Sequence, residues 1–475
     1  MSADGGRERA VAAALAQIDD GRFFDVLARR VAHRTESQRA DSAPQLLAYL
    51  TEELRPALEV LGFDVALHDN PVEGCAPFLV ARRDEGAHLP TLLSYGHADV
   101  IRGMDDKWAP GLSPWTLLAQ GERWYGRGSA DNKAQHSLNL MALGAVLAER
   151  GALGFNAVFL FEAGEEVGSP GLHAFCTQQR KALAADVLIA SDGPRLAATR
   201  PTLFMGSRGN LNFDLSVDLR AGAHHSGNWG GLLANPGVIL AHALACIIDR
   251  HGRILVPGLE PESIPASVRA ALANCPVESA PGDPTIDDAW GREGLSRAEK
   301  VYGWNTFEVL AFTTGQPEAP VNAIPPRARA HCQIRFTVDR DPTTFLPALR
   351  AHLDAKGFEQ VQITAADKQP FPATRLDPVH PAVQWAAASV QRTLGSAPAL
   401  LPNLGGSLPN DCFAGILGLP TLWVPHSYAD CAQHAPNEHV LQPLLREGAQ
   451  IMAGLFWDFA DVSAAERAQW RLSRD

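Results

Sequence analysis

The sequence lacks the cysteine pattern of a disulfide framework or of a thiolate zinc site. Its seven cysteines are odd in number, scattered along the chain and never spaced as C-x-x-C. Such cysteines are typical of proteins that stay reduced, because disulfides persist mainly in oxidising compartments. We therefore expect a cytoplasmic protein without structural disulfides.

The sequence also lacks the long apolar run that a membrane protein needs. No stretch of about 18 apolar residues is present, and the first residues, MSADGGRERA, contain no apolar core of a signal peptide. Acidic residues outnumber basic ones by 53 to 41, for a formal net charge of -12. A broad nucleic-acid surface requires clustered Lys and Arg. We expect neither nucleic acid nor a membrane as a partner.

Several hydrolase and nucleotide-binding motifs are missing as well. A serine hydrolase of the α/β type needs G-x-S-x-G, and a mononuclear zincin needs H-E-x-x-H; neither occurs. A nucleotide-binding enzyme needs a P-loop or a G-x-G-x-x-G after a strand, and Gly126-Arg-Gly128 stops short of both. These absences exclude three familiar ways to build a catalytic site.

Helix-like and strand-like segments alternate in the first part of the chain. Helical periodicity covers Ala10–Ala32, Gln45–Leu61 and Lys133–Arg150. Apolar strand-like runs cover Phe63–His68, Phe78–Arg82, Thr91–Tyr95, Ala157–Phe161 and Asp186–Ala190. Such alternation predicts an α/β domain, with a mainly parallel sheet covered by helices on both faces.

The pattern changes near Gly209. Alternating strands are predicted at Asn210–Val217, Phe307–Thr313, Ala330–Val338 and Gln360–Thr364, with helices at Pro236–Arg250 and Thr343–Lys356 and a Pro-rich stretch at Val256–Pro284. After Pro372 we expect a helix at His380–Leu394, a strand at Thr421–Val424 and a final helix from about Pro443. We therefore predict an α/β domain of residues 1–208 and 373–475, interrupted by a smaller α+β domain of residues 209–372.

Five short segments place His, Asp and Glu beside glycines, close to these apolar runs. In the first, Ser94-Tyr-Gly-His97-Ala-Asp99, residues i and i+2 of an extended strand point to the same face. His97 can then bind a metal while Asp99 accepts a hydrogen bond from its other ring nitrogen. The alternative is a His–Asp pair with a purely structural role.

The other four segments have structural alternatives of their own. Asp131, in Gly-Ser-Ala-Asp131-Asn, can be a helix N-cap. Glu165 and Glu166 follow a buried strand, where adjacent carboxylates need a cation or a proton unless the loop is solvated. Asp192 can be a turn residue, and His434 can lie on the surface.

Taken together, these residues suit a metal centre. Two histidines and three carboxylates, with no thiolate, favour zinc, manganese or cobalt. In open α/β sheets, ligands bind at the carboxyl ends of the strands. One shared carboxylate can bridge two metals about 3.5–4 Å apart, as in two-metal hydrolases. Glu165 is then left as a base.

At these residues the chain resembles the M20 family of metallopeptidases, the aminoacylase/carboxypeptidase-type dinuclear zinc hydrolases. The resemblance runs from about Thr91 to Glu438, in the order GHADV, YGRGSADNKA, FEAGEEVGSPG, SDGP and HAPNE. It is closest to the carnosinase-like dipeptidases in DDKWAPGLSPWTL, ERWYGRGSADNK and HHSGNWGG. The departures are small: Lys107 stands where relatives often carry Gly, and Leu408 where Ile is frequent.

The resemblance implies a role for each residue of the centre. His97 and Asp192 would hold one divalent ion, and Glu166 and His434 the other. The remaining residues would be a bridging Asp131, a general base Glu165, and Asp99, which would orient His97. The two ions would be zinc, with manganese or cobalt as alternatives.

The resemblance also implies that the inserted domain is a lid and a dimerisation domain. A lid histidine, His225 by its match to HSG, would complete the active site of the neighbouring subunit, with His224 as the alternative. Asn322 and Arg335 would hold the substrate carboxylate, and Gly406 and Ser407 belong to a glycine-rich substrate loop. From the residues alone, Arg335 can equally be an exposed strand residue and Asn322 a turn residue before Pro325.

The expected function is metal-dependent hydrolysis of an amide or peptide bond in a small substrate with a free carboxylate. A dipeptidase is the first choice. An N-acyl-amino-acid deacylase, or a carboxypeptidase acting on short N-blocked substrates, is the alternative. A binding-only relative would be expected to have lost Glu165 or a ligand, and all are present. The expected partners are a small peptide or N-acyl amino acid and a second copy of the chain.

Overall fold

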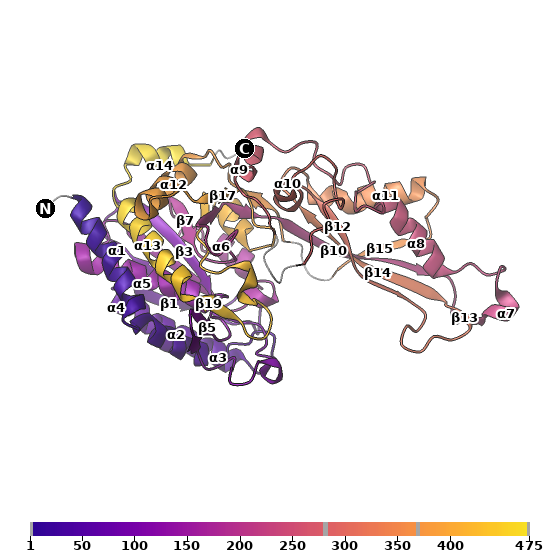
Figure 1. The fold of residues 1–475 in the computed structure, drawn as a ribbon, viewed down its shortest axis with the longest axis horizontal. Coiled ribbons are helices and arrows are strands. Elements are labelled where there is room, and N and C mark those ends of the chain that lie inside the picture. Colours follow the sequence, from indigo (N-terminus) through magenta and orange to yellow (C-terminus); the bar gives the residue numbers. More distant parts are fainter. Residues whose placement is uncertain (1–2, 279–283, 367–370, 473–475) are drawn as a thin grey trace. The chain divides into compact units, whose positions relative to one another are not determined.

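The computed structural model describes residues 3–278, 284–366 and 371–472 (Figure 1). The chain divides into two compact units. The first comprises Met1–Gly206, Leu376–Pro402 and Pro409–Asp475, and the second comprises Ser207–Arg375 and Asn403–Leu408. The short segment Asn403–Leu408 groups with the second unit, whereas the sequence analysis assigned it to the larger domain.

The first unit is built on an eight-stranded sheet. In spatial order its strands are β1 (Asp64–His68), β2 (Phe78–Arg83), β6 (Asn156–Glu162), β3 (Thr91–His97), β7 (Val187–Ala190), β18 (Thr421–Trp423), β8 (Thr202–Phe204) and β17 (Ala399–Leu401). The central strands β6, β3, β7 and β18 run parallel to one another. A small sheet of β4 (Leu118–Gln120), β5 (Arg123–Tyr125) and β19 (His439–Leu441) accompanies it.

Helices cover both faces of the large sheet. The helices of this unit are α1 (Ala3–Asp19), α2 (Arg22–Ala32), α3 (Ala43–Ala48), α4 (Arg55–Val60), α5 (Lys133–Arg150), α6 (Leu172–Gln178), α12 (Pro381–Leu394), α13 (Gln442–Phe459) and α14 (Ala464–Trp470). Helices α1, α5, α12 and α13 share one apolar core with the sheet (Figure 1). On the other face, α6 packs through Phe175 onto Phe78 of β2, with ring centroids 4.3 Å apart. The expected α/β class with a mainly parallel central sheet is confirmed.

Two predicted helices are broken in the structure. The segment Ala10–Ala32 forms two helices because Gly21, at φ 84°, turns the chain between α1 and α2. The segment Gln45–Leu61 contains a π-helical stretch, Tyr49–Leu54, between α3 and α4. Helical periodicity predicts that a face is buried, and it does not exclude a local change of helix type or direction.

The second unit is an α+β layer. Its four-stranded sheet has the order β12 (Thr306–Thr314), β14 (Arg327–Phe336), β10 (Gly209–Asp218) and β15 (Gln362–Ala365), all antiparallel. Helices α8 (Pro236–Ile247) and α11 (Phe345–Ala355) cover one face, which carries the alternate apolar residues of β10 and β14 (Figure 1). The opposite face carries polar side chains, including Glu308 and Arg335.

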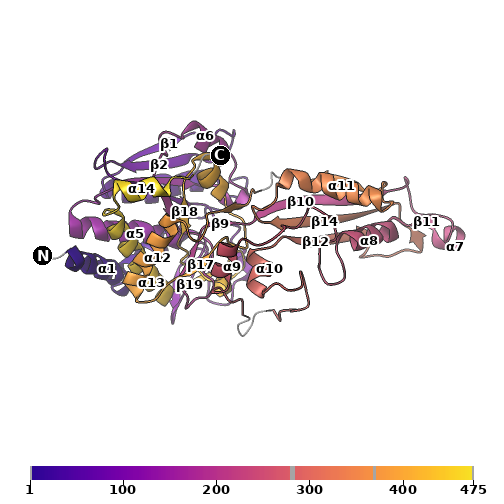
Figure 2. The same ribbon diagram turned by 90° about the horizontal axis from the view of Figure 1, so that it is seen from above.

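The short elements of the second unit lie at its two ends. Strands β11 (His224–His225) and β13 (Ala323–Ile324) pair beside α7 (Ser226–Trp229), at the end of the unit away from α9 (Ala266–Leu272) and α10 (Arg297–Tyr302) (Figure 2). Strands β9 (Gly206–Ser207) and β16 (Thr374–Arg375) lie where the chain passes between units. No helix in the described part of the chain is both long and apolar enough to cross a membrane.

A buried ion pair joins the first helix of the first unit to its last long helix. The Arg7 guanidinium of α1 donates to both oxygens of Asp458 in α13, at 2.8 and 3.0 Å, and both side chains are almost fully buried. Ser389 of α12 donates to the same carboxylate. Three helices distant in sequence therefore meet at one carboxylate.

We predict that Arg7→Met destabilises the protein by about 2 kcal/mol, because the Asp458 carboxylate loses the hydrogen bonds from Arg7 and keeps those from Arg392 and Ser389. Urea unfolding followed by circular dichroism measures the change. The control is Arg22→Met, which removes the exposed pair with Asp20 and is expected to leave the free energy of unfolding nearly unchanged. Equal effects of the two substitutions would contradict this account.

Candidate metal centre

Three parallel strands deliver acidic and imidazole side chains to one edge of the sheet. His97 is the last residue of β3, Glu165 and Glu166 follow β6 in a 3₁₀ turn, and Asp192 follows β7 by two residues. Neighbouring parallel strands end at the same edge, so these side chains converge although they are far apart in sequence. Asp131 joins them from the loop before α5.

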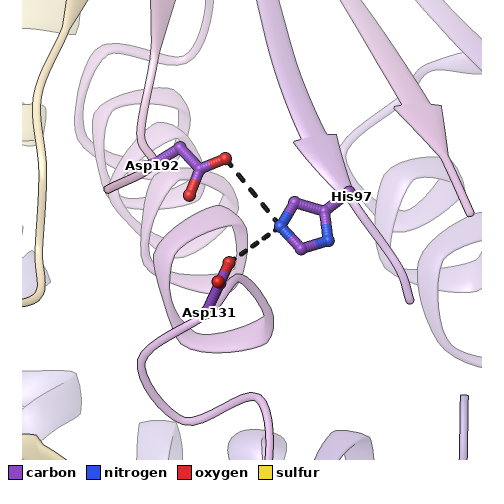
Figure 3. Close-up of side chains that lie close together, drawn as sticks. All are labelled: His97, Asp131 and Asp192. Atoms are coloured by element: carbon purple, nitrogen blue, oxygen red, sulfur yellow. Dashed lines mark hydrogen bonds and ion pairs between the residues drawn. The ribbon is translucent and has the colours of Figure 1, made fainter. Parts of the chain in front are cut away.

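The first group consists of His97, Asp131 and Asp192 (Figure 3). The Nε2 atom of His97 lies 2.8 Å from Oδ1 of Asp131 and 3.8 Å from Oδ2 of Asp192. All three side chains are buried. Helix α5 packs so closely here that a Cβ on Gly96 would lie 2.8 Å from Cβ of His136, so the glycine before His97 is required sterically.

The second group consists of Asp131, Glu166 and His434. The Nε2 atom of His434 lies 3.1 Å from Oδ2 of Asp131 and 3.0 Å from Oε2 of Glu166. His434 adopts φ 60°, in the left-handed region that non-glycine residues seldom occupy. Asp131 thus directs one oxygen to each group and is their common member.

The charges of the two groups fit divalent cations. Burial, reinforced by the charge of Asp131, raises the pKa of Glu166 to about 7 and the pKa of Asp192 to about 6. Each group also holds one buried carboxylate oxygen, Oε1 of Glu166 and Oδ2 of Asp192, with no hydrogen-bond partner among the described residues. Cations would satisfy these oxygens and offset the repulsion between the carboxylates, and the N/O donor set suits zinc, manganese or cobalt.

Asp99 holds both His97 and the glutamate turn. Its backbone carbonyl accepts a hydrogen bond from Nδ1 of His97 at 3.0 Å, and its carboxylate lies 3.4 Å from the same nitrogen. The carboxylate oxygens also accept the backbone N–H groups of Glu165 and Glu166, at 3.2 and 3.1 Å. The contact with His97 agrees with the i, i+2 spacing, whereas the bonds to the glutamate turn could not be read from the sequence.

Glu165 lies in the same electrostatic environment. Burial raises the pKa of its carboxyl well above the usual range, and the charges of Asp192 and Glu166 raise it further against the opposing effect of His97. Glu165 belongs to neither group of candidate ligands. Its carboxylate is therefore available for proton transfer.

Glu438, for which no role was predicted, fixes the loop that carries Asp131. Its Oε1 atom accepts the backbone N–H groups of Gly128, Ala130 and Asp131 at 2.8–3.0 Å. Its Oε2 atom accepts a 2.6 Å hydrogen bond from Arg127, and both side chains are buried. The sequence signal for Glu438 was its position four residues after the candidate ligand His434. The loop that it binds lies about 300 residues earlier, and spacing could not predict that contact.

In the second unit, two of the candidate substrate residues are in contact. Nη1 of Arg335 donates to Oγ of Ser407 at 2.9 Å, and its Nε donates to Gln333 at 3.1 Å. The Arg335 guanidinium is half-buried and both partners are neutral. Gly406 stands next to Ser407 and is exposed.

The candidate lid histidine and Asn322 lie together at the β11–β13 end of the unit (Figure 2). His225 is exposed and accepts the backbone N–H of Gly227 through Nδ1 at 3.1 Å. His224 instead packs its ring against Trp229, with centroids 5.9 Å apart. Asn322 is exposed, and its carbonyl oxygen accepts the N–H of Ser226 at 2.9 Å.

A family model and several known proteins match most of the chain. The model of the peptidase family M20/M25/M40 matches residues 93–458, a span that includes every candidate residue of the metal centre. The cysteinylglycine-S-conjugate dipeptidase of Corynebacterium striatum is 27% identical over 402 residues, covering 82% of this chain and 84% of the relative. The β-Ala-His dipeptidase of Mus musculus is 25% identical over 410 residues, covering 81% and 80%.

A solved structure has the same fold. The M20 family metallo-carboxypeptidase Sso-CP2 from Sulfolobus solfataricus superimposes with a TM-score of 0.78 at 22% identity, over 93% of this chain and 99% of that chain. The resemblance on which the family expectation rested is therefore confirmed. The chain belongs to peptidase family M20/M25/M40 and is an M20-type metallopeptidase.

Proposed function

We propose that the protein is a dinuclear metal-dependent dipeptidase. One observation carries the proposal: the two groups of candidate ligands share Asp131, which directs one oxygen to each. The sequence relatives described above are named dipeptidases. We assign His97, Asp131 and Asp192 to one cation and Asp131, Glu166 and His434 to the other.

The two cations are proposed to be zinc, with manganese or cobalt able to replace it. When bound, such ions lower the pKa of water towards about 7 and polarise a carbonyl group. Asp99 would keep Nε2 of His97 directed towards its group through the contacts at Nδ1. Glu438 would keep the Asp131 loop in register with both histidines.

Glu165 is proposed as the general base. Its carboxylate accepts the proton of the attacking water and passes it to the leaving amine, so that one residue serves both proton transfers. The Asp99 carboxylate fixes the backbone of Glu165. A base held in this way loses little freedom on reaching the transition state.

The substrate is proposed to carry a free carboxylate that Arg335, Asn322, Gly406 and Ser407 recognise. The contact between Arg335 and Ser407 supports this assignment, because the guanidinium has no carboxylate partner of its own among the described residues. A carboxypeptidase acting on short N-blocked substrates is the second candidate, because Sso-CP2 is named a metallo-carboxypeptidase. An N-acyl-amino-acid deacylase is the third reading of the same chemistry.

We further propose a homodimer formed through the second unit, acting as lid and dimerisation domain, in which His225 donates to the developing oxyanion in the partner's site. The ring of His224 packs against Trp229, whereas the ring of His225 has no aromatic contact among the described residues, and this difference supports the choice of His225. We also propose a cytoplasmic location, since the seven cysteines lack the spacing of a disulfide framework.

A substrate panel tests the dipeptidase proposal. The protein loaded with Zn²⁺, Mn²⁺ or Co²⁺ is expected to hydrolyse Cys-Gly, β-Ala-His and other dipeptides at least about ten-fold faster, in kcat/KM, than the matching N-acetyl amino acids, a difference of about 1.4 kcal/mol. Chelation is expected to abolish turnover and metal addition to restore it. The reverse preference would favour the deacylase. Turnover that survives verified metal removal would contradict the metal mechanism.

A second prediction concerns the base. Glu165→Gln keeps the size of the side chain and removes its basicity, so kcat should fall by about 10³-fold, within the usual range for general acid–base catalysis. Metal content and melting temperature should stay unchanged. The control is Glu52→Gln, at an exposed position of the same unit, which should retain full activity. A Glu165→Gln enzyme with near-normal kcat and bound metal would contradict the assignment of Glu165 as the general base.

The third prediction tests the partner histidine. His225→Ala should lower kcat by about 10²–10³-fold through the loss of an oxyanion donor. Mixed dimers of His225→Ala and Asp131→Ala subunits should regain activity, because one site then has both its ligands and the partner's His225. Mixing His225→Ala with the double variant His225→Ala/Asp131→Ala provides the control and should show no recovery. Verified mixed dimers without recovery would refute action in trans.

A further inference from the structure

The second unit contains a cavity of about 410 Å³, within the usual range for a small-molecule site. It is lined by Arg208, by Thr306 and Glu308 of β12, and by Trp290 and Trp304. Neither Arg335 nor Ser407 lines it. The cavity is therefore distinct from the residues assigned to the substrate carboxylate.

Most charged side chains around the cavity already have partners. Arg292 pairs with Glu260 at 3.1 Å and lies over the ring of Trp304, whose Nε1 donates to the same carboxylate at 2.8 Å. Arg297 pairs with Asp288 through two hydrogen bonds of 2.6 and 2.8 Å. Lys300 donates to the backbone carbonyls of Asp288 and Trp290, and Asp287 accepts the backbone N–H of Ala289, so these two groups are hydrogen-bonded as well.

Arg208 differs from them. Its side chain is buried, its Nε donates to the carbonyl of Gly405 at 3.2 Å, and its Nη1 has no hydrogen-bond partner among the described residues. Burial lowers the pKa of the guanidinium to about 10, and the group stays charged at neutral pH. A buried cation without a counter-charge is costly unless a ligand supplies one.

Glu308 is the matching anion. It lines the same cavity, is half-buried, and forms no hydrogen bond or ion pair with another residue in the described part of the unit. Burial raises the pKa of its carboxyl, and the positive charge of Arg208 opposes that rise. The two groups therefore interact electrostatically without a hydrogen bond. Among the charged residues that line the cavity, Arg208 has an Nη1 atom without a hydrogen-bond partner, and Glu308 forms no hydrogen bond or ion pair in the described part of the unit.

We propose that this cavity binds a free α-amino acid with an apolar side chain, its carboxylate on Arg208, its ammonium on Glu308 and its side chain against Trp290 and Trp304. A simple anion would leave Glu308 unpaired, and a simple amine would leave Arg208 unpaired. A zwitterion satisfies both. The site rests on its own contacts and not on the proposed function, although peptide hydrolysis would release ligands of this class.

Ligand analogues test the proposal without disturbing the fold. Isothermal titration of the metal-loaded protein compares L-leucine with 4-methylpentanoate, which lacks the ammonium, and with 3-methylbutylamine, which lacks the carboxylate. Leucine is expected to bind about 10–100-fold more tightly than either, the effect of one charged hydrogen-bonding group. Equal affinities, or no leucine binding up to its solubility limit, would overturn the proposal.

Variants then locate the binding. Glu308→Gln should weaken leucine binding about ten-fold and remove the preference for leucine over 4-methylpentanoate. Trp290→Ala, at a position 47% exposed, should also weaken it. Glu318→Gln, at an exposed loop position of the same unit, is the control. Leucine binding that survives Glu308→Gln but is lost in Arg335→Met would place the amino acid at the substrate residues and refute a separate site.

Discussion

The arrangement of the metal centre depends on the carboxylate of Asp131. It stands between His97 at the end of β3 and His434 near the end of the chain, with one oxygen towards each. The sheet fixes the end of β3, and this sets the position of His97, the last residue of that strand. Asp131 and His434 come from loops, so their meeting requires separate support.

That support comes from carboxylates that touch no candidate ligand atom. Glu438 accepts hydrogen bonds from three backbone N–H groups of the Asp131 loop and from the Arg127 guanidinium, which ties this loop to the chain beyond His434. Asp99 accepts the N–H groups of the glutamate turn while its carbonyl holds Nδ1 of His97. Each buried carboxylate here satisfies backbone donors, and thereby fixes the geometry of the groups that face the cations.

The elements that were predicted correctly are those whose local residue pattern agrees with their position in the fold. Helix α5 was predicted at its observed bounds because Gly151 ends it, and β3 and β6 were predicted within two residues because they are short apolar runs. Strand β8 and the edge strand β17 were missed, since three residues carry too little periodicity. The candidate ligands were found by residue type and order, whereas the bonds of Glu438 and Arg208 depend on contacts about 200–300 residues apart, which no local pattern encodes.

The two units differ in the sign of the buried charge that lacks a counter-charge. In the first, buried carboxylates crowd together and leave oxygens without partners, which calls for cations. In the second, Arg335 and Arg208 are bound mainly by neutral oxygens of the segment Asn403–Leu408, which calls for carboxylates. Ser407 links these two guanidinium residues, because its Oγ accepts from Arg335 and donates to the backbone carbonyl of Arg208. The two arginines therefore belong to one hydrogen-bond network, which includes the loop that carries Gly406.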